Sequence, residues 1–379
     1  MRQAWIAFPR RACAALAFTA AQAACAADLT LAQVDWSRGE IAREAAQSYA
    51  GAKACVDLAN ASGGVAGRRL RLVRVAAAHA KEEPAQLLAR VVQQEQPLAI
   101  LNLTGADYVR ALLKSQQLYA SAVPVVGVSP GAESLRAPWN PYVFHLRAGD
   151  RAQLARMLSH LGTLGLANVA VAYEDDEFGR DGLRHVQELA GAQGVAVKAA
   201  FAVPAARADA IATVAKTAAA SGAQAHLLVL RGEAGVRYLA ALRQHAGATP
   251  VYGMSYLSAG ESAQGDGGKA PASIALAQIT PNPAAAATPL TREYLRAMKE
   301  FAPPGERPSP ESLAGCIAAR TVVEALRRMG GEPTPARLTA QLWNLRADLG
   351  GFVLDLTGSN VGSHLVDIGW VDAGGRLRF

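Results

Sequence analysis

The sequence has few charged residues, few aromatic rings and no long apolar run in its main part. Of the 379 residues, 18 % are charged and 6 % are aromatic, while 51 % are hydrophobic. This composition is typical of a globular protein and excludes a disordered one. After the N-terminal segment no run reaches 18 apolar residues, so we expect a soluble mature protein without a membrane-spanning helix. The length allows two domains and a sizeable core.

The sequence also lacks any concentration of positive charge. Its formal net charge of +7 falls to +4 without residues 1–27, because that segment holds three arginines and no acid. A charge of this size without a basic run gives no reason to expect a nucleic-acid partner.

The N-terminus has the pattern of a secretory signal. The arginines precede an apolar run over residues 12–20, and small residues follow at 23–27. This is the order of the n-region, the h-region and the cleavage site. We therefore expect cleavage after Ala26 or Ala27 and export to the periplasm. A lipidated Cys25 and a twin-arginine signal stay open as variants of this interpretation.

Cysteine is scarce, and the mature chain keeps only Cys55 and Cys316. Both lie in apolar helical patterns, which favours their interpretation as small buried hydrophobic residues. An even pair in an oxidising compartment can also form a disulfide, so that alternative stays open.

Apolar runs of strand length alternate with segments of helical spacing along most of the chain. The first series starts with a predicted strand at 29–34 and a helix at 41–60, and a second series starts with the helix from Arg151. Repeated βα units of this kind predict parallel, doubly wound sheets. Two series predict an α/β protein with two similar lobes.

One polar stretch, residues 173–182, follows the predicted strand at 169–172 and precedes a segment of helical spacing. In open α/β sheets this edge is where ligands bind. Phe178 is the candidate ligand contact within it. The four acids at 174–177 lack the spacing of a calcium loop. We expect solvated charges at a helix start there, rather than a metal site or an acid–base pair.

Residues 127–131 match the G-x-S-x-G pattern of a nucleophile elbow, which raises the possibility of a serine hydrolase. The oxyanion hole would need the backbone N–H of the residue after Ser129, but Pro130 has none. The Ser129 hydroxyl, with N–H groups from Gly131 to Glu133 at a helix start, suits a bound carboxylate instead. We therefore predict no catalytic residue, no metal and no cofactor.

Asp150 lies at the junction of the two series. Its carboxylate can cap the helix that begins at Arg151. It can also pair with the ammonium group of a ligand held between two lobes. Both interpretations stay open.

Five segments, taken in order, resemble the motifs of one known family. The family patterns are NaxGGvxGr, yeDdafGrdg, sqvvPnP, sleGyiaAr and dlGgf, and the matching segments are 60–68, 173–182, 277–283, 312–320 and 348–352. Over nearly all of its mature length the chain resembles the branched-chain amino-acid-type substrate-binding proteins of ABC transporters. These are type I periplasmic binding proteins, and they include the leucine/isoleucine/valine-binding protein.

The resemblance implies two Rossmann-like lobes joined by a three-strand hinge, with a ligand closing the cleft. Behind the signal peptide at 1–27, lobe 1 would comprise 28–149 with 279–357, and lobe 2 would comprise 150–278 with 358–379. The protein would not be an enzyme. As a monomer it would capture a small polar ligand (an amino acid, an amide or a small carboxylate) and deliver it to an ABC permease in the inner membrane. A ligand-sensing role for a receptor or regulator is the alternative, and an exported serine hydrolase is the third possibility.

Carried over by position, the resemblance also implies a ligand site. Thr104, Gly105 and Ala132 would meet the ligand carboxylate, Asp150 its ammonium group, and Phe178 would form an aromatic wall. Amino-acid binders of the family usually carry a second acid in the loop after the strand matching 251–253, and this sequence has none there. Glu233 is a candidate substitute. The predicted ligand-binding residues are Thr104, Gly105, Ser129, Ala132, Glu133, Asp150, Phe178, Glu233 and Ser255.

Overall fold

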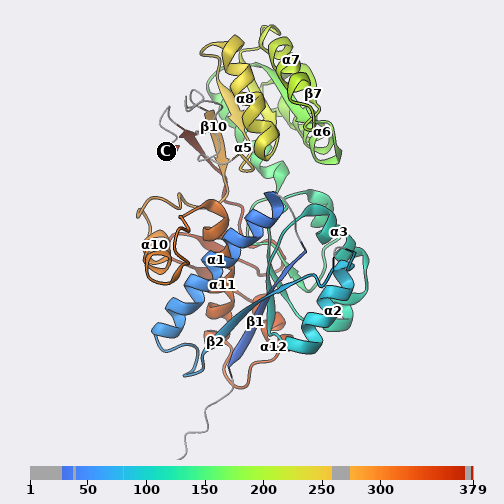
Figure 1. Ribbon diagram of the computed structural model, residues 1–379. Coiled ribbons are helices and arrows are strands. Elements are labelled where there is room, and N and C mark those ends of the chain that lie inside the picture. The colour runs from blue at the N-terminus through green and yellow to red at the C-terminus, as the bar shows by residue number, and fades with distance from the viewer. Residues whose placement is uncertain (1–27, 37–39, 80, 258–273, 372–376, 379) are drawn as a thin grey trace, which may run out of the picture.

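The computed structural model of the protein has two stacked lobes, each built on its own β-sheet (Figure 1). The described residues are 28–36, 40–79, 81–257, 274–371 and 377–378. The predicted signal peptide, with Cys25 and the cleavage site, lies outside the described residues. Within them, no helix combines the length and the hydropathy needed to cross a membrane.

The sheet of the first lobe is fully parallel, with the order β2-β1-β3-β4-β5. Its strands are β1 (Leu29–Asp35), β2 (Leu70–Ala76), β3 (Ala99–Leu103), β4 (Val125–Val128) and β5 (Val143–Phe144). Side chains along a strand point to alternate faces. On β1, Leu29 and Leu31 therefore enter one hydrophobic core, whereas Ala32 and Val34 enter the other.

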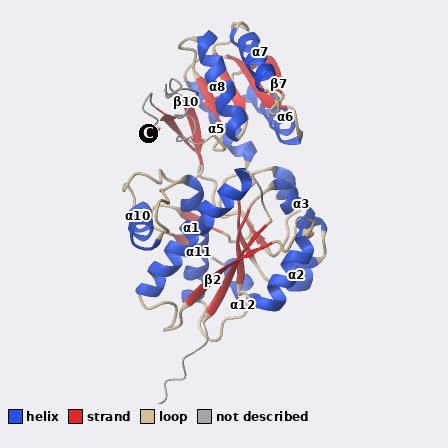
Figure 2. Cartoon of the chain, in the orientation of Figure 1, coloured by secondary structure: helices blue, strands red, loops and turns tan. Residues whose placement is uncertain are grey.

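Helices cover both faces of this sheet (Figure 2). One layer contains α1 (Glu40–Ala61), α10 (Pro289–Phe301), α11 (Pro310–Arg328) and α12 (Pro335–Leu342). The other contains α2 (Pro84–Glu95), α3 (Ala106–Lys114) and α4 (Gln117–Ser121), with the short 3-10 helix η1 (Glu133–Leu135) beside it. A small hairpin of β11 (Arg346–Asp348) and β12 (Val353–Asp355) completes the lobe.

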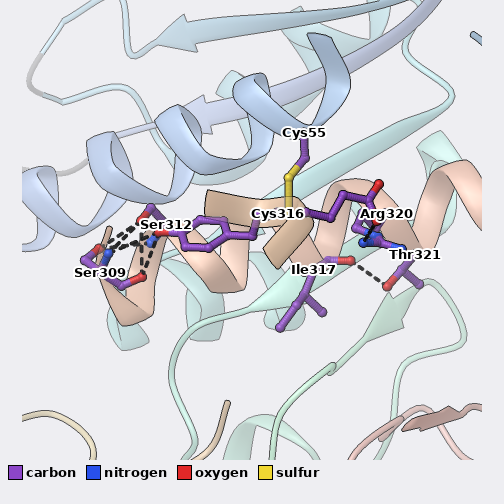
Figure 3. Close-up of a disulfide and its surroundings, with 9 residues drawn as sticks. Cys55, Ser309, Ser312, Cys316, Ile317, Arg320 and Thr321 are labelled. Atoms are coloured by element: carbon purple, nitrogen blue, oxygen red, sulfur yellow. Dashed lines mark hydrogen bonds and ion pairs between the residues drawn. A yellow bond between two sulfur atoms is a disulfide. The ribbon is translucent and has the colours of Figure 1, made fainter. Parts of the chain in front are cut away.

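Helices α1 and α11 are joined by a disulfide between Cys55 and Cys316, whose Cα atoms are 5.4 Å apart (Figure 3). The favoured interpretation of this pair as unlinked hydrophobic residues is therefore wrong. The two helices also approach closely at glycines. A Cβ at Gly51 would lie 1.8 Å from the Ser312 carbonyl oxygen, and one at Gly315 would lie 1.9 Å from the Ser48 carbonyl oxygen.

The sheet of the second lobe has the order β14-β13-β10-β9-β8-β6-β7. Its strands are β6 (Asn168–Glu174), β7 (Ala196–Val203), β8 (Ala225–Val229), β9 (Val251–Gly253), β10 (Ile274–Gln278), β13 (Asp367–Val371) and β14 (Leu377–Arg378). Five of these strands, β10, β9, β8, β6 and β7, are parallel, as predicted. At one edge β13 pairs antiparallel with β10, and β14 pairs antiparallel with β13. Only five residues separate β13 from β14, and a parallel pairing would need a crossover connection of about a dozen residues or more.

Helices pack on both faces of the second sheet (Figure 2), and four of them lie within the described residues. The helices α5 (Asp150–Thr163) and α6 (Glu177–Ala190) share one core, and α6 continues into the 3-10 helix η2 (Gly191–Gln193). The helices α7 (Ala208–Ala219) and α8 (Gly232–Ala246) share the other.

The chain passes between the two sheets three times, after β5, after β10 and after β12. Two of these crossings are hydrogen-bonded to each other. The His145 N–H donates to the Asn360 carbonyl at 2.7 Å, and the Gly362 N–H donates to the His145 carbonyl at 2.8 Å. This confirms the α/β fold with two lobes, while the residue boundaries assigned to the lobes stay a prediction.

Candidate functional site

Segments that follow strands of both lobes meet at Asp150, whose side chain is almost fully buried at the start of α5. The Tyr256 hydroxyl donates to Asp150 Oδ1 at 2.7 Å, and Gln153 Nε2 donates to the same oxygen at 3.4 Å. Burial raises the pKa of the Asp150 carboxyl, and the nearby Arg147 opposes that shift. The residue that caps α5 is Gly149, so the interpretation of Asp150 as the helix cap is wrong.

Tyr256 connects the two lobes through its hydroxyl group. The Gly131 N–H, from the segment after β4, donates to Tyr256 Oη at 2.8 Å. Burial and the neighbouring Asp150 carboxylate raise the pKa of Tyr256 well above its usual value, so the hydroxyl keeps its proton. The group therefore accepts from Gly131 and donates to Asp150. A ligand ammonium group would make the same donation to Asp150.

Arg147, on the first crossing, binds residues of both lobes. Its Nη1 donates to the Ser129 carbonyl at 2.6 Å, and its Nη2 donates to Ser255 Oγ at 3.3 Å. The guanidinium carbon lies 5.1 Å from the centre of the Tyr256 ring, within the range of a cation–π interaction. Arg147 Nη2 is 3.9 Å from Asp150 Oδ1.

The Ser129 hydroxyl donates a hydrogen bond to Glu44, a half-buried residue on α1. Burial raises the pKa of the Glu44 carboxyl, and the negative charge of Glu311 adds to the shift, whereas the Ser129 hydrogen bond opposes it. The partner of the serine is thus a carboxylate and not a histidine base. With Pro130 behind it, this is not the arrangement of a hydrolase nucleophile.

Phe178 lies half-buried at the start of α6, where it contacts Tyr256. The two ring centres are 5.3 Å apart and nearly perpendicular. Arg231, after β8, places its guanidinium carbon 4.3 Å from the centre of the Phe178 ring. Phe178 is therefore brought into the same group as Asp150.

The expectation that all four acids at 174–177 are solvated is wrong for Glu174. Its side chain is buried and binds Arg231, with 2.6 Å between Oε2 and Nη2 and 2.6 Å between Oε1 and the Arg231 backbone nitrogen. Asp176 caps α6 by accepting from the Gly179 N–H at 2.9 Å. Asp175 is exposed, and the exposed Glu177 forms an ion pair with Arg110 of α3, in the other lobe, at 3.0 Å.

Thr104 and Gly105 occupy the turn between β3 and α3. Thr104 is buried, and its carbonyl accepts from Trp36 Nε1 at 3.3 Å. Gly105 has a φ of 79°, and a Cβ there would lie 2.8 Å from the Tyr108 ring. The Trp36 and Tyr108 rings are 5.3 Å apart, so this edge of the first lobe is lined with aromatic side chains.

The other predicted site residues have different surroundings. Ala132 precedes η1, and Glu133 Oε1 accepts from the Arg151 N–H at 3.2 Å. The Ser255 N–H donates to Gln153 Oε1 at 3.0 Å. Glu233 is exposed at the start of α8, where it pairs with Arg237.

Sequence reasoning missed Glu44, Arg147 and Tyr256 as members of this group. The sequence could have indicated Arg147 and Tyr256 only through their places in the chain. Arg147 shortly precedes Asp150, and Tyr256 lies in the loop after β9. Among the residues that the structure describes, no group of three or more His, Cys, Asp and Glu side chains is arranged to hold a metal ion.

The chain matches a known protein family and resembles several solved structures. The profile of the family described as periplasmic binding protein matches residues 30–362. The structure is similar to an extracellular ligand-binding receptor from Verminephrobacter eiseniae, at 31 % identity and a TM-score of 0.83, covering 93 % of this chain and 100 % of that one. It is also similar to a substrate-binding periplasmic protein from Ralstonia solanacearum, at 27 % identity and a TM-score of 0.80, covering 93 % and 99 %.

A third similar structure is a branched-chain amino acid ABC transporter protein from Thermus thermophilus with bound valine. It shares 16 % identity at a TM-score of 0.76, covering 93 % of this chain and 94 % of that one, and so shares the fold alone. No curated protein has a sequence with significant similarity to this chain.

Proposed function

Since this chain belongs to the family of periplasmic binding proteins, we propose that it captures a small polar ligand between its two lobes and delivers it to an ABC permease in the inner membrane. The observation that supports this most is the polar group around Asp150, in which Tyr256 and Arg147 bind residues of both lobes. A ligand that binds both lobes at once stabilises the closed arrangement by its differential affinity.

The proposed ligand is an amino acid, an amide or a small carboxylate. The proposed binding residues remain those predicted from the sequence, on lobes of 28–149 with 279–357 and of 150–278 with 358–379. The related protein from Thermus thermophilus was solved with bound valine, which supports this size of ligand.

We further propose that the protein works as a monomer in the periplasm, after removal of residues 1–27. The disulfide between Cys55 and Cys316 supports an oxidising compartment, because disulfides are rare in the cytosol. The alternative is a ligand-sensing role for a receptor or regulator. The similar protein from Verminephrobacter eiseniae is described as an extracellular ligand-binding receptor, which supports this alternative. Co-purification of an ABC permease with the tagged protein would support transport, and co-purification of a sensor kinase would support sensing.

A thermal-shift screen of the mature protein tests the proposed function. The panel contains amino acids, their amides and small carboxylates. The cognate compound should raise the melting temperature in a concentration-dependent way, since a ligand at about 100 times its Kd adds about 2.7 kcal/mol to the stability. If no compound of the panel raises it, the proposed function is wrong.

An esterase assay tests the remaining alternative, the hydrolase. We expect no activity above background in the wild type or in Ser129→Ala. Turnover that is present in the wild type and lost in the variant would show that Ser129 is a nucleophile.

A further inference from the structure

We propose that Glu44, and not Asp150, is the acid that meets the ligand, and that the ligand presents to it an ammonium or amide N–H group. The inference rests on the proposed function, replaces Asp150 by Glu44 as the acid among the proposed binding residues, and names the chemical class of the ligand.

Asp150 is buried, and its Oδ1 already accepts hydrogen bonds from side chains of the protein. Its side chain is 7 % exposed, and the Tyr256 hydroxyl donates to it at 2.7 Å. A ligand nitrogen at Asp150 Oδ1 would have to displace the Tyr256 hydroxyl, which also accepts the 2.8 Å hydrogen bond from the Gly131 N–H. The protein's own hydroxyl therefore takes the place that an ammonium group would need.

Glu44 keeps unused hydrogen-bonding capacity. A carboxylate accepts about four hydrogen bonds, and the hydrogen bond described for Glu44 comes from Ser129. As a whole residue Glu44 is half-buried, whereas Asp150 is almost fully buried. Burial and the negative charge of Glu311 raise the pKa of Glu44, so a further donor or cation beside its carboxyl group would stabilise the charged form.

The position of Glu44 in the fold also favours it as the acid that meets the ligand. Glu44 lies in the second turn of α1, and a Cβ at Gly105 would lie 3.5 Å from Ile41 on the same helix. The start of α1 thus packs against the start of α3, at the edge where Thr104 and Ser129 follow their strands. In sheets of this kind ligands bind at that edge.

Arg147 supplies the complementary group beside Glu44. Its guanidinium has five N–H donors. The described hydrogen bonds use three of them, to the Ser129 carbonyl, Ser255 Oγ and the Ala148 carbonyl. Glu44 binds the Ser129 hydroxyl and Arg147 binds the Ser129 carbonyl, so an acceptor and a donor lie on either side of Ser129. They match a ligand in which a nitrogen donor lies near an oxygen acceptor. A carboxylate without nitrogen would face the charge of Glu44.

Isothermal titration calorimetry on matched compounds tests this inference. The nitrogen-bearing probes are the amino acids and their amides, and each is paired with the carboxylate of the same skeleton without the amino group. We expect at least one nitrogen-bearing probe to bind the wild type, and its nitrogen-free analogue to bind at least about tenfold more weakly. Glu44→Gln should weaken the nitrogen-bearing probe by about tenfold or more and its analogue much less.

Two further variants provide the comparison. Asp57→Asn changes another acid of α1, paired with Lys53, and should leave all affinities at the wild-type value. Asp150→Asn should affect a probe and its analogue by the same factor, because Asp150 acts through Tyr256. The ligand-free melting temperature of each variant reports whether it has folded.

The outcomes separate the inference from the proposed function. If only nitrogen-free carboxylates bind, or if Glu44→Gln binds the nitrogen-bearing probe as the wild type does, the inference is wrong while ligand capture stands. It is equally wrong if the loss in Asp150→Asn is selective for the nitrogen-bearing probe. If no compound of either class binds, both fail.

Discussion

His145, at the first crossing between the lobes, is a buried histidine whose two ring nitrogens have no hydrogen-bond partner among the described residues. Burial lowers the pKa of this imidazole to about 3, and the positive charge of Arg136 adds to the effect. The folded protein therefore keeps His145 neutral, whereas the unfolded chain protonates it below about pH 6.5. The buried position becomes a cost to stability as the pH falls.

His145→Leu should make the unfolding free energy less sensitive to acid. Between pH 6.5 and 3 His145 binds a proton in the unfolded chain but not in the folded protein, so the unfolding free energy decreases as the pH is lowered. At pH 5 this group alone lowers the unfolding free energy by about 2 kcal/mol relative to neutral pH. Urea unfolding at pH 7 and pH 5 measures the effect in both proteins. Glu44 and Asp150, whose pKa values are raised, shift stability in the opposite direction in both. Equal losses for wild type and variant would contradict the account of His145.

The placement of single residues was predictable from the sequence where it depends on chain position alone, while their contact with a ligand stays a prediction. Asp150 and Phe178 were assigned to the junction and to a strand-end loop, and both lie in the group around Tyr256. Glu174 was misassigned because its partner, Arg231, is 57 residues away along the chain. Tyr256 was missed for the same reason, since its contact with Asp150 spans 106 residues. Neither separation leaves a local pattern.

At the scale of elements, the helices α1 and α11 cross in close backbone contact. Gly51 and Gly315 each face a backbone carbonyl of the other helix, which explains the glycine in the segment 312–320. Strands and helices of this lobe were predictable because apolar spacing is a local property. The antiparallel pairing of β13 with β10 was not, because the two strands are far apart in the sequence and the chain passes through the first lobe between them.

Gly315→Ala should destabilise the protein, because the new Cβ overlaps the Ser48 carbonyl and the helices must move apart. We expect a loss of about 1–3 kcal/mol or more in unfolding free energy. Gly191→Ala is the control, since a Cβ there meets nothing within 4 Å. Equal stability of the two variants in urea unfolding would show that the crossing tolerates a methyl group.

The disulfide joins the same two helices across 261 residues of chain. Replacing both cysteines, in Cys55→Ser/Cys316→Ser, should lower the unfolding free energy by about 2–5 kcal/mol. Reductant should lower the melting temperature of the wild type towards that of the variant and leave the variant unchanged. Thiol titration of the denatured, unreduced mature protein should find no free cysteine, and a titre of two would contradict the bond.

At the scale of the whole molecule, the chain forms two α/β lobes (Figure 1). Segments that follow strands of both lobes meet in the polar group around Asp150. The two-lobe architecture was predictable from two series of βα units and five ordered motifs. The site was predictable only in part, because residues of α1, of the first crossing and of the loop after β9 meet there only in the folded chain.

Hydrogen–deuterium exchange with the ligand from the thermal-shift screen tests most directly whether that ligand is held between the lobes. The account predicts slower exchange of backbone amides in both lobes, after β4 in residues 129–136 and after β6 and β9 in residues 174–182 and 254–257. Exchange in α7 and α12 should not change. Protection in one lobe only, or only away from these segments, would contradict capture between the lobes.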